Sequence, residues 1–181
     1  LLPDSNEPTD LRVMCVNRKC EFHARRQPHG IPILAVDDPI FRRLPAFVIS
    51  TVDKFANLPW VGETAGLFGR VERYDAEGFY GPSAPGQGRA LSAPLPPADL
   101  IIQDELHLIS GPLGTMVGLY ETAIDALCRA GAVGEGQGPK IIASTATVRR
   151  AERQIRALFG RTGVEVFPPP GPDRRDSFFA E

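Results

Sequence analysis

Two adjacent carboxylates and a nearby histidine are the side chains of this sequence best suited to chemistry. Asp104 and Glu105 follow the apolar residues 100–102 after a single glutamine, and His107 stands two positions beyond Glu105. A carboxylate at a strand end can hold a magnesium ion, usually through water, while its neighbour orients a water toward a terminal phosphate. The alternative is an ordinary acidic loop end beside a solvated histidine, which describes most Asp–Glu pairs.

Hydroxyl side chains follow a second apolar run. Residues 141–143 lead into three hydroxyls, those of Ser144, Thr145 and Thr147, and then into an arginine-rich stretch. Hydroxyls at this place can link the carboxylates to a neighbouring domain or to a polyanion. The ordinary alternative is that Thr147 caps the following helix while the other hydroxyls bond locally.

A third polar group ends the run "AFVIST" at residues 46–51. Ser50 and Thr51 stand at the predicted start of a helix, where exposed amides and hydroxyls suit a phosphate of a nucleic-acid backbone. Helix capping explains the same pattern without any ligand.

Strands and helices in alternation must position these groups, and the alternation predicts a parallel sheet in an α/β fold. Ligands bind beyond the carboxyl ends of the strands in such sheets, and each polar group falls at such an end. We expect strands at residues 11–16, 46–51, 99–106, 140–147 and 164–167.

Periodicity predicts the helices. Residues 116–128 carry apolar side chains at helical spacing, and Gly131 follows as the left-handed residue that commonly ends a helix. After Thr147 we expect a helix to residue 159, apolar on one face and arginine-rich on the other, with Gly160 as its stop. A short helical turn is expected at residues 52–58.

Glycine, proline and alanine dominate residues 62–97, which predicts a long excursion with little regular structure. The prolines in residues 167–181 predict a linker toward a further domain. Residues 1–166 would then form one α/β domain with the excursion inserted in it. The sequence begins without methionine, and we expect a fragment of a longer protein.

Composition excludes few classes of protein. The formal net charge is −2, so a contact with a polyanion must come from a local basic patch. No apolar run approaches the roughly 18 residues of a membrane span, and no signal segment opens the sequence. We expect a cytoplasmic protein with no membrane contact.

Cys15, Cys20 and His23 cluster near the start of the sequence. Structural zinc normally takes four protein ligands at closer, paired spacing, and His29 is the one further ligand nearby. Burial of the cysteines as small apolar side chains is the favoured interpretation, with zinc binding kept as its alternative.

Three segments taken together resemble a known family. "ISTVDKF", "QDELH" and "ASTAT" resemble motifs Ib, II and III of superfamily 2 helicases, in that order and each at a predicted strand end. The resemblance covers residues 33–167. More narrowly, the sequence resembles the helicase-like component of the bacterial DISARM phage-defence system.

The resemblance implies a P-loop NTPase (RecA-like) sheet flanked by helices, with ATP and Mg²⁺ as cofactors. Asp104 would be the acid of the DExH box that holds Mg²⁺ through water. Glu105 would activate the hydrolytic water, and His107 would couple the nucleotide state to a second motor domain.

The same resemblance implies roles for two further sets of residues. The motif Ib residues Ser50, Thr51 and Lys54 would contact the nucleic-acid backbone. Those of motif III would couple the two motor domains, and they are Ser144, Thr145 and Thr147. The implied partners are nucleic acid, more DNA than RNA, the rest of the helicase chain and other defence proteins.

One departure from the family pattern limits these implications. No G-x-x-x-x-G-K-[ST] phosphate-binding loop occurs in these 181 residues. We therefore expect an incomplete first motor domain, which by itself binds ATP weakly or not at all.

Two other classes of function stay open. A non-catalytic α/β scaffold could bind nucleic acid or protein through residues 62–97, with a vestigial acidic strand end. A metal-dependent nuclease could use Asp104 and Glu105, although no second acidic cluster falls at another predicted strand end.

Overall fold

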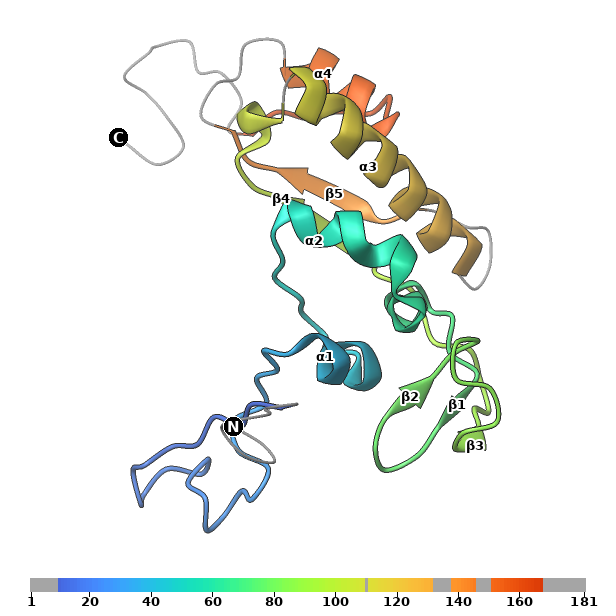
Figure 1. Ribbon diagram of the computed structural model, residues 1–181. Coiled ribbons are helices and arrows are strands. Elements are labelled where there is room, and N and C mark those ends of the chain that lie inside the picture. Colours follow the sequence, from blue (N-terminus) through green and yellow to red (C-terminus); the bar gives the residue numbers. More distant parts are fainter. Residues whose placement is uncertain (1–9, 110, 132–137, 146–150, 168–181) are drawn as a thin grey trace. The chain divides into compact units, whose positions relative to one another are not determined.

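The computed structural model describes residues 10–109, 111–131, 138–145 and 151–167. The chain divides into two compact units. The first comprises residues 1–99 and 127–139, and the second comprises residues 100–126 and 140–181. Figure 1 labels their helices and strands. Within the described residues, no helix is both long and apolar enough to cross a membrane.

Short helices make up much of the first unit. They are α1 (Asp37–Arg43), α2 (Val52–Asn57), and the 3₁₀ helices η1 (Leu58–Trp60) and η2 (Gly62–Phe68). In α1 the first turn is acidic and the last turn is basic, which favours the helix dipole. The prediction of a helical turn after Thr51 is confirmed by α2 and η1.

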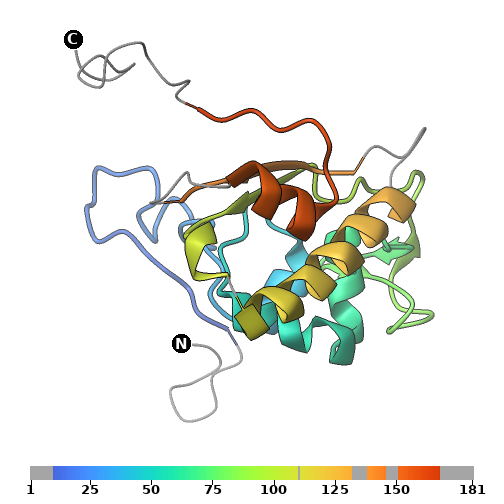
Figure 2. The same cartoon turned by 90° about the horizontal axis from the view of Figure 1, so that it is seen from above.

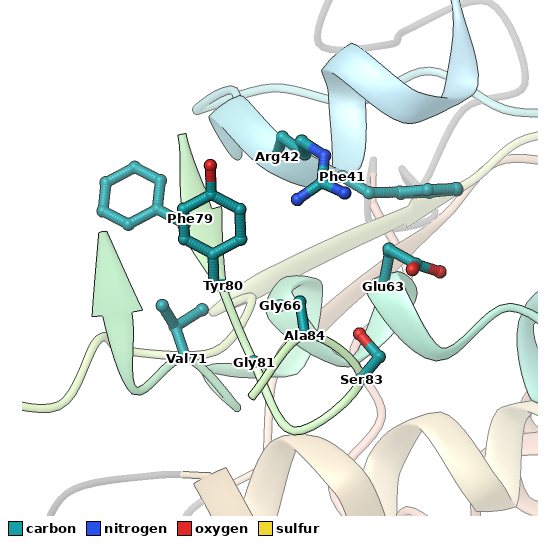
Figure 3. Close-up of a pocket in the computed structure, with 10 residues that line it drawn as sticks. All are labelled: Phe41, Arg42, Glu63, Gly66, Val71, Phe79, Tyr80, Gly81, Ser83 and Ala84. Carbon is teal, nitrogen blue, oxygen red and sulfur yellow. The ribbon is translucent and has the colours of Figure 1, made fainter. Parts of the chain in front are cut away.

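A small antiparallel sheet completes the first unit. Its strands are β1 (Arg73–Tyr74), β2 (Phe79–Tyr80) and β3 (Arg89–Ala90), in the order β2-β1-β3. The guanidinium of Arg42 in α1 lies 5.1 Å from the ring centre of Tyr80, a cation–π contact that joins helix to sheet (Figure 3). Residues 62–97 therefore hold more regular structure than predicted, because η2 and this sheet lie within them.

Two predicted strands of the first unit are wrong. Residues 11–16 form only isolated bridges, at Val13 to Ile31 and at Cys15 to His23. Residues 46–51 form no strand, and the side chains of Phe47 and Ile49 are 71% and 85% exposed. A strand needs a neighbouring backbone to bond with, and none of the described residues supplies one here.

The second unit contains the parallel sheet. Strands β4 (Leu100–Gln103) and β5 (Lys140–Ala143) pair in parallel, from Leu100 opposite Lys140 to Gln103 opposite Ala143. The 3₁₀ helix η3 (Leu106–Leu108) follows β4, α3 (Gly111–Gly131) begins after it, and α4 (Ala151–Phe159) lies beyond β5. Strands at these two places and an α/β fold with a parallel sheet are confirmed.

Helices α3 and α4 lie side by side (Figure 2). A β-carbon at Gly118 of α3 would stand 3.9 Å from Leu158 of α4, an ordinary van der Waals distance, so the two helices are neighbours at this point. Leu158 and Phe159 are buried, as the predicted inward face of α4 requires. Residues 164–167 form no strand, contrary to prediction, since no described strand pairs with them.

The two helix-ending glycines behave differently. Gly160 is left-handed, with φ of 61°, and its N–H donates to the carbonyl of Arg156, which confirms it as the stop of α4. Gly131 is not left-handed and is the last residue of α3. A β-carbon there would collide with the carbonyl oxygen of Phe68, so close approach explains this glycine.

Candidate functional site

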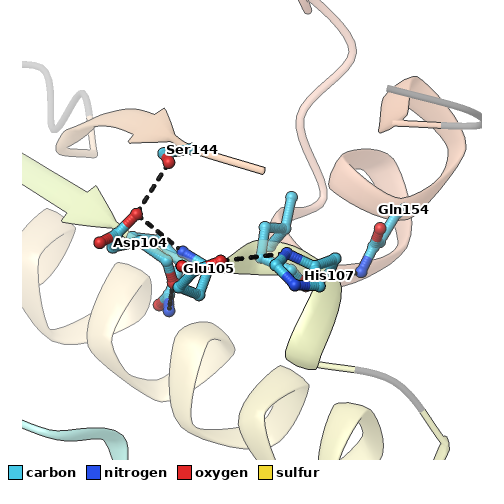
Figure 4. A network of polar contacts seen from close by, with 7 residues as sticks. Asp104, Glu105, His107, Ser144 and Gln154 are labelled. Carbon is cyan, nitrogen blue, oxygen red and sulfur yellow. Dashed lines mark hydrogen bonds and ion pairs between the residues drawn. The ribbon is translucent and has the colours of Figure 1, made fainter. Parts of the chain in front are cut away.

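The carboxylate of Asp104 lies just beyond the end of β4 and is held on one side. Its Oδ1 accepts the hydroxyl of Ser144 at 2.8 Å and the N–H of Glu105 at 2.9 Å (Figure 4). The Ser144 hydroxyl, and then the Glu105 N–H, lower the pKa of Asp104 below its ordinary 3.8. Its Oδ2 bonds to no described residue, so this oxygen is left for water or a hydrated cation.

Ser144 reaches Asp104 because the sheet ladder continues past the last residue of β5. The N–H of Ser144 donates to the carbonyl of Gln103 at 2.9 Å. Its own carbonyl accepts the N–H of Leu106 at 2.8 Å. These two backbone bonds fix Ser144 opposite Asp104, and its hydroxyl meets the carboxylate. Two separate strand ends thus come together here, as parallel pairing requires.

Glu105 has a left-handed backbone, with φ of 53°. This conformation costs a residue other than glycine about 1 kcal/mol. It turns the chain out of the strand and starts η3, whose residue His107 follows. The Glu105 side chain is 57% exposed and is free to meet a water.

His107 carries an unsatisfied ring nitrogen. Its Nδ1 lies 3.2 Å from Oε2 of Glu105, an ion-pair distance if the imidazole is protonated. The contact is not aligned as a hydrogen bond, and this buried nitrogen has no hydrogen-bond partner among the described residues. A further polar group brought to this place could therefore form a hydrogen bond with Nδ1 of His107.

Gln154 joins this site from α4, and sequence reasoning missed it. Its Nε2 donates to the carbonyls of Leu106 and Ile109, both at 3.0 Å. Gln154 stands four residues before the buried Leu158, on the same face of α4. A polar residue on the inward face of an amphipathic helix was the signal that could have revealed it.

The motif Ib residues belong to the first unit. Thr51 occupies the N-cap of α2 without a capping bond from its side chain, and its hydroxyl lowers the pKa of Asp53. The hydroxyl of Ser50 donates to the carbonyl of Thr51 at 3.3 Å. Nζ of Lys54 lies 2.8 Å from Asp37, and this hydrogen bond raises the pKa of Lys54.

These groups border a cavity of about 500 Å³ in the first unit. Most of its wall is apolar, including Ile40, Phe55 and Leu58, and the Lys54–Asp37 pair is its charged part. Because Asp37 neutralises Lys54, a phosphate would have to compete with this carboxylate for the ammonium group.

Cys15, Cys20 and His23 are the residues considered for zinc. Among the described residues, no three ligands are placed to hold a metal ion. Cys15 and His23 are bridge partners, but Nδ1 of His23 already accepts the N–H of Arg25 at 3.2 Å, and Cys20 is a free thiol. Thr145 follows Ser144 as a half-buried residue, and Thr147 lies outside the described residues.

A buried acid in α3 is a second feature that sequence reasoning missed. Glu121 is 8% exposed, and burial, with the nearby charge of Asp125, raises its pKa to about 6. Asp125 itself pairs with Arg161. Glu121 falls between the buried Val117 and Ile124 on the inward stripe of the helix.

No family model matches the chain. It is 46% identical to the DISARM protein DrmA of Bacillus paralicheniformis, over 95% of this chain. The chain spans 16% of the length of that relative. The predicted resemblance to a DISARM component is confirmed: over nearly all of its length, this chain is homologous to a segment of the DISARM protein DrmA.

Proposed function

We propose that this chain is part of the ATPase motor of a superfamily 2 nucleic-acid helicase or translocase that serves in phage defence. The observation that carries the proposal is the Asp104 carboxylate, held by Ser144 through one oxygen and open to solvent through the other. Similarity to a DISARM protein supports the defence role. Other proteins of such a defence system are the proposed partners.

The donor set fits a magnesium nucleotide. Mg²⁺ is commonly held by one or two carboxylates, waters and substrate phosphates, and Asp104 with its free oxygen would be one such carboxylate. When bound, Mg²⁺–ATP supplies the phosphoanhydride and the charge neutralisation that its cleavage needs. The pKa of Asp104 is lowered from its ordinary 3.8, so the carboxylate stays charged at more acidic pH than an ordinary aspartate does.

Glu105 and His107 have different roles in hydrolysis. The exposed carboxylate of Glu105 orients a water for attack and accepts its proton. Nδ1 of His107 has no hydrogen-bond partner among the described residues and lies beside the Glu105 carboxylate. His107 therefore senses whether Glu105 is engaged with water and nucleotide, and it couples this nucleotide state to the second motor domain.

A phosphate-binding loop must come from outside these 181 residues, since they contain no G-x-x-x-x-G-K-[ST] sequence. The proposal therefore concerns the full-length protein. Nucleic acid, with DNA favoured over RNA, would contact the first unit near Ser50, Thr51 and Lys54, where a phosphate competes with Asp37.

ATP hydrolysis by the full-length protein, with and without DNA, tests the proposal. Glu105→Gln should lower kcat at least about 100-fold while nucleotide binding persists. Glu165→Gln is the matched control, because Glu165 is exposed in the same unit. If the wild-type protein binds DNA but does not hydrolyse ATP, the motor proposal is wrong and a non-catalytic scaffold is the better description.

A further inference from the structure

The backbone turn that carries Glu105 and His107 is anchored on its apolar side. The N–H of Leu108 donates to the carbonyl of Glu105 at 2.9 Å, and that of Ile109 to the carbonyl of Leu106 at 3.1 Å. The side chain of Leu106 is completely buried, and that of Ile109 nearly so. The turn is thus a compact unit whose position decides where both polar side chains stand.

One side chain from α4 satisfies two carbonyls of this turn. The amide nitrogen of Gln154 carries two hydrogens, and it lies 3.0 Å from the carbonyl oxygens of Leu106 and of Ile109. With the amide reversed, an oxygen would face two oxygens, so these acceptors dictate its orientation. The carbonyl of Leu106 also accepts the N–H of Ile109, so Gln154 supplies its second donor and ties it to the carbonyl of Ile109. Through these two bonds Gln154 clamps the turn.

Gln154 holds the end of residues 104–109, and Ser144 holds their beginning. Ser144 holds the Asp104 carboxylate (Figure 4) and the N–H of Leu106. Gln154 holds the carbonyls of Leu106 and Ile109. Both residues come after β5 in the sequence: Ser144 follows β5 directly, and Gln154 lies in α4. The acidic segment is held from two directions by one stretch of polypeptide.

We propose that Gln154 is a positioning residue of the candidate ATPase site, an inference that rests on the function proposed above. It touches no reacting atom. It acts through the turn, fixing where the Glu105 carboxylate and the His107 ring lie relative to Asp104. Displacement of α4 would withdraw the clamp, release the turn and slow hydrolysis, which makes α4 a control element of this site.

The test uses the full-length protein in four forms: wild type, Gln154→Ala, Gln154→Glu and Arg153→Ala. Glutamate keeps the size of glutamine but replaces the donor with a carboxylate that the two carbonyls repel. Arg153 is the exposed neighbour of Gln154 in α4, so its truncation is a matched control. Hydrogen–deuterium exchange of the peptide covering residues 104–109 reports the clamp, and steady-state kinetics report catalysis.

Both Gln154 variants should exchange faster than wild type at residues 104–109, while exchange in β4 stays unchanged. Their kcat should fall about 10- to 100-fold, with KM for ATP within about 3-fold of wild type, because geometry and not binding is lost. Arg153→Ala should match wild type in both measurements. Retained kcat in both Gln154 variants, or an equal loss in Arg153→Ala, would overturn the proposal.

The two proposals fail in different ways. If the wild-type protein does not hydrolyse ATP, the motor function fails, and the exchange data still show whether Gln154 holds the turn. If wild type hydrolyses ATP and both variants exchange and turn over as wild type does, only the role of Gln154 fails. Should Gln154→Ala not fold, the isosteric Gln154→Glu carries the test.

Discussion

The hydroxyl of Ser144 donates to the same carboxylate oxygen of Asp104 that receives the N–H of Glu105. One oxygen of Asp104 is thereby fully engaged and the other is left open. A short side chain that follows β5 thus orients an acid that follows β4 and lowers its pKa.

Replacing Ser144 with alanine should raise the pKa of Asp104 toward its ordinary 3.8, because the first cause of its lowering is removed. A carboxylate with a depressed pKa adds stability above the unfolded-state value and loses it as pH falls through the folded-state value. The stability gap between wild type and Ser144→Ala should therefore be full above about pH 4 and close below it. Carboxyl NMR titration measures the pKa, and equal values in both proteins would refute the bond.

Replacing Glu105 with glycine should stabilise the fold while removing activity. Glycine adopts φ of 53° without the cost of about 1 kcal/mol that glutamate bears. Glu105→Gln keeps that cost, and it serves as the comparison in urea denaturation. A Glu105→Gly protein less stable than Glu105→Gln would contradict the left-handed backbone at this position.

Replacing Gly131 with alanine should destabilise the first unit by about 1–3 kcal/mol, because the added methyl group collides with the carbonyl of Phe68. Gly163→Ala is the control, since open space surrounds Gly163 and its φ is not positive. Thermal denaturation of both variants compares them. If Gly131→Ala proves as stable as Gly163→Ala, the close approach is wrong.

Replacing Glu121 with glutamine should stabilise the protein at high pH. The folded state raises the pKa of this acid from 4.5 to about 6, so the folded protein binds more protons than the unfolded one between these values. Stability therefore falls as pH rises through this window. The gain from Glu121→Gln should reach up to about 2 kcal/mol at pH 8 and vanish near pH 4, since a pKa change of 1 is worth about 1.4 kcal/mol.

The negative charge of Asp125 adds to the effect of burial on the pKa of Glu121, and Asp125 itself pairs with Arg161. Glu165→Gln, at an exposed position, should show no such pH dependence. Denaturation curves at pH 4, 6 and 8 provide the measurement. A gain that does not change with pH would show that Glu121 is not protonated on burial.

Replacing Asp37 with asparagine should tighten the binding of DNA to the full-length protein, because Lys54 loses the carboxylate that neutralises it. Lys54→Ala should weaken binding and lower the salt slope of log K by about 1. Lys140→Ala, which removes an exposed lysine of the second unit, is the control. If Lys54→Ala and wild type show the same salt slope, Lys54 makes no contact with a phosphate.

Local patterns predicted the second unit well. The apolar runs before Asp104 and Ser144 became β4 and β5, and the periodicity of residues 116–128 became α3. Parallel pairing then placed the two polar strand ends together. These features depend on periodicity and on one rule of sheet topology, both of which can be read from a sequence.

The features that sequence missed depend on distant neighbours. Residues 46–51 have strand-forming side chains but lack a described neighbour to pair with. The role of Gln154 follows from two carbonyls more than forty positions away. The left-handed Glu105 lies between two residues, Gln103 and Leu106, whose backbones both bond to Ser144. Gly131 is explained by Phe68, not by its own conformation.

The uncovered segment at residues 46–51 also bears on how the protein behaves in concentrated solution. It is uncharged, contains no proline and is rich in aromatic and β-branched residues, and Phe47 and Ile49 are largely exposed. Short segments of this kind can stack with identical copies into cross-β fibrils. Purified on its own, this chain would thus expose a hexapeptide with the composition of a cross-β segment, and a lysine in place of Ile49 should lower any aggregation that this segment causes.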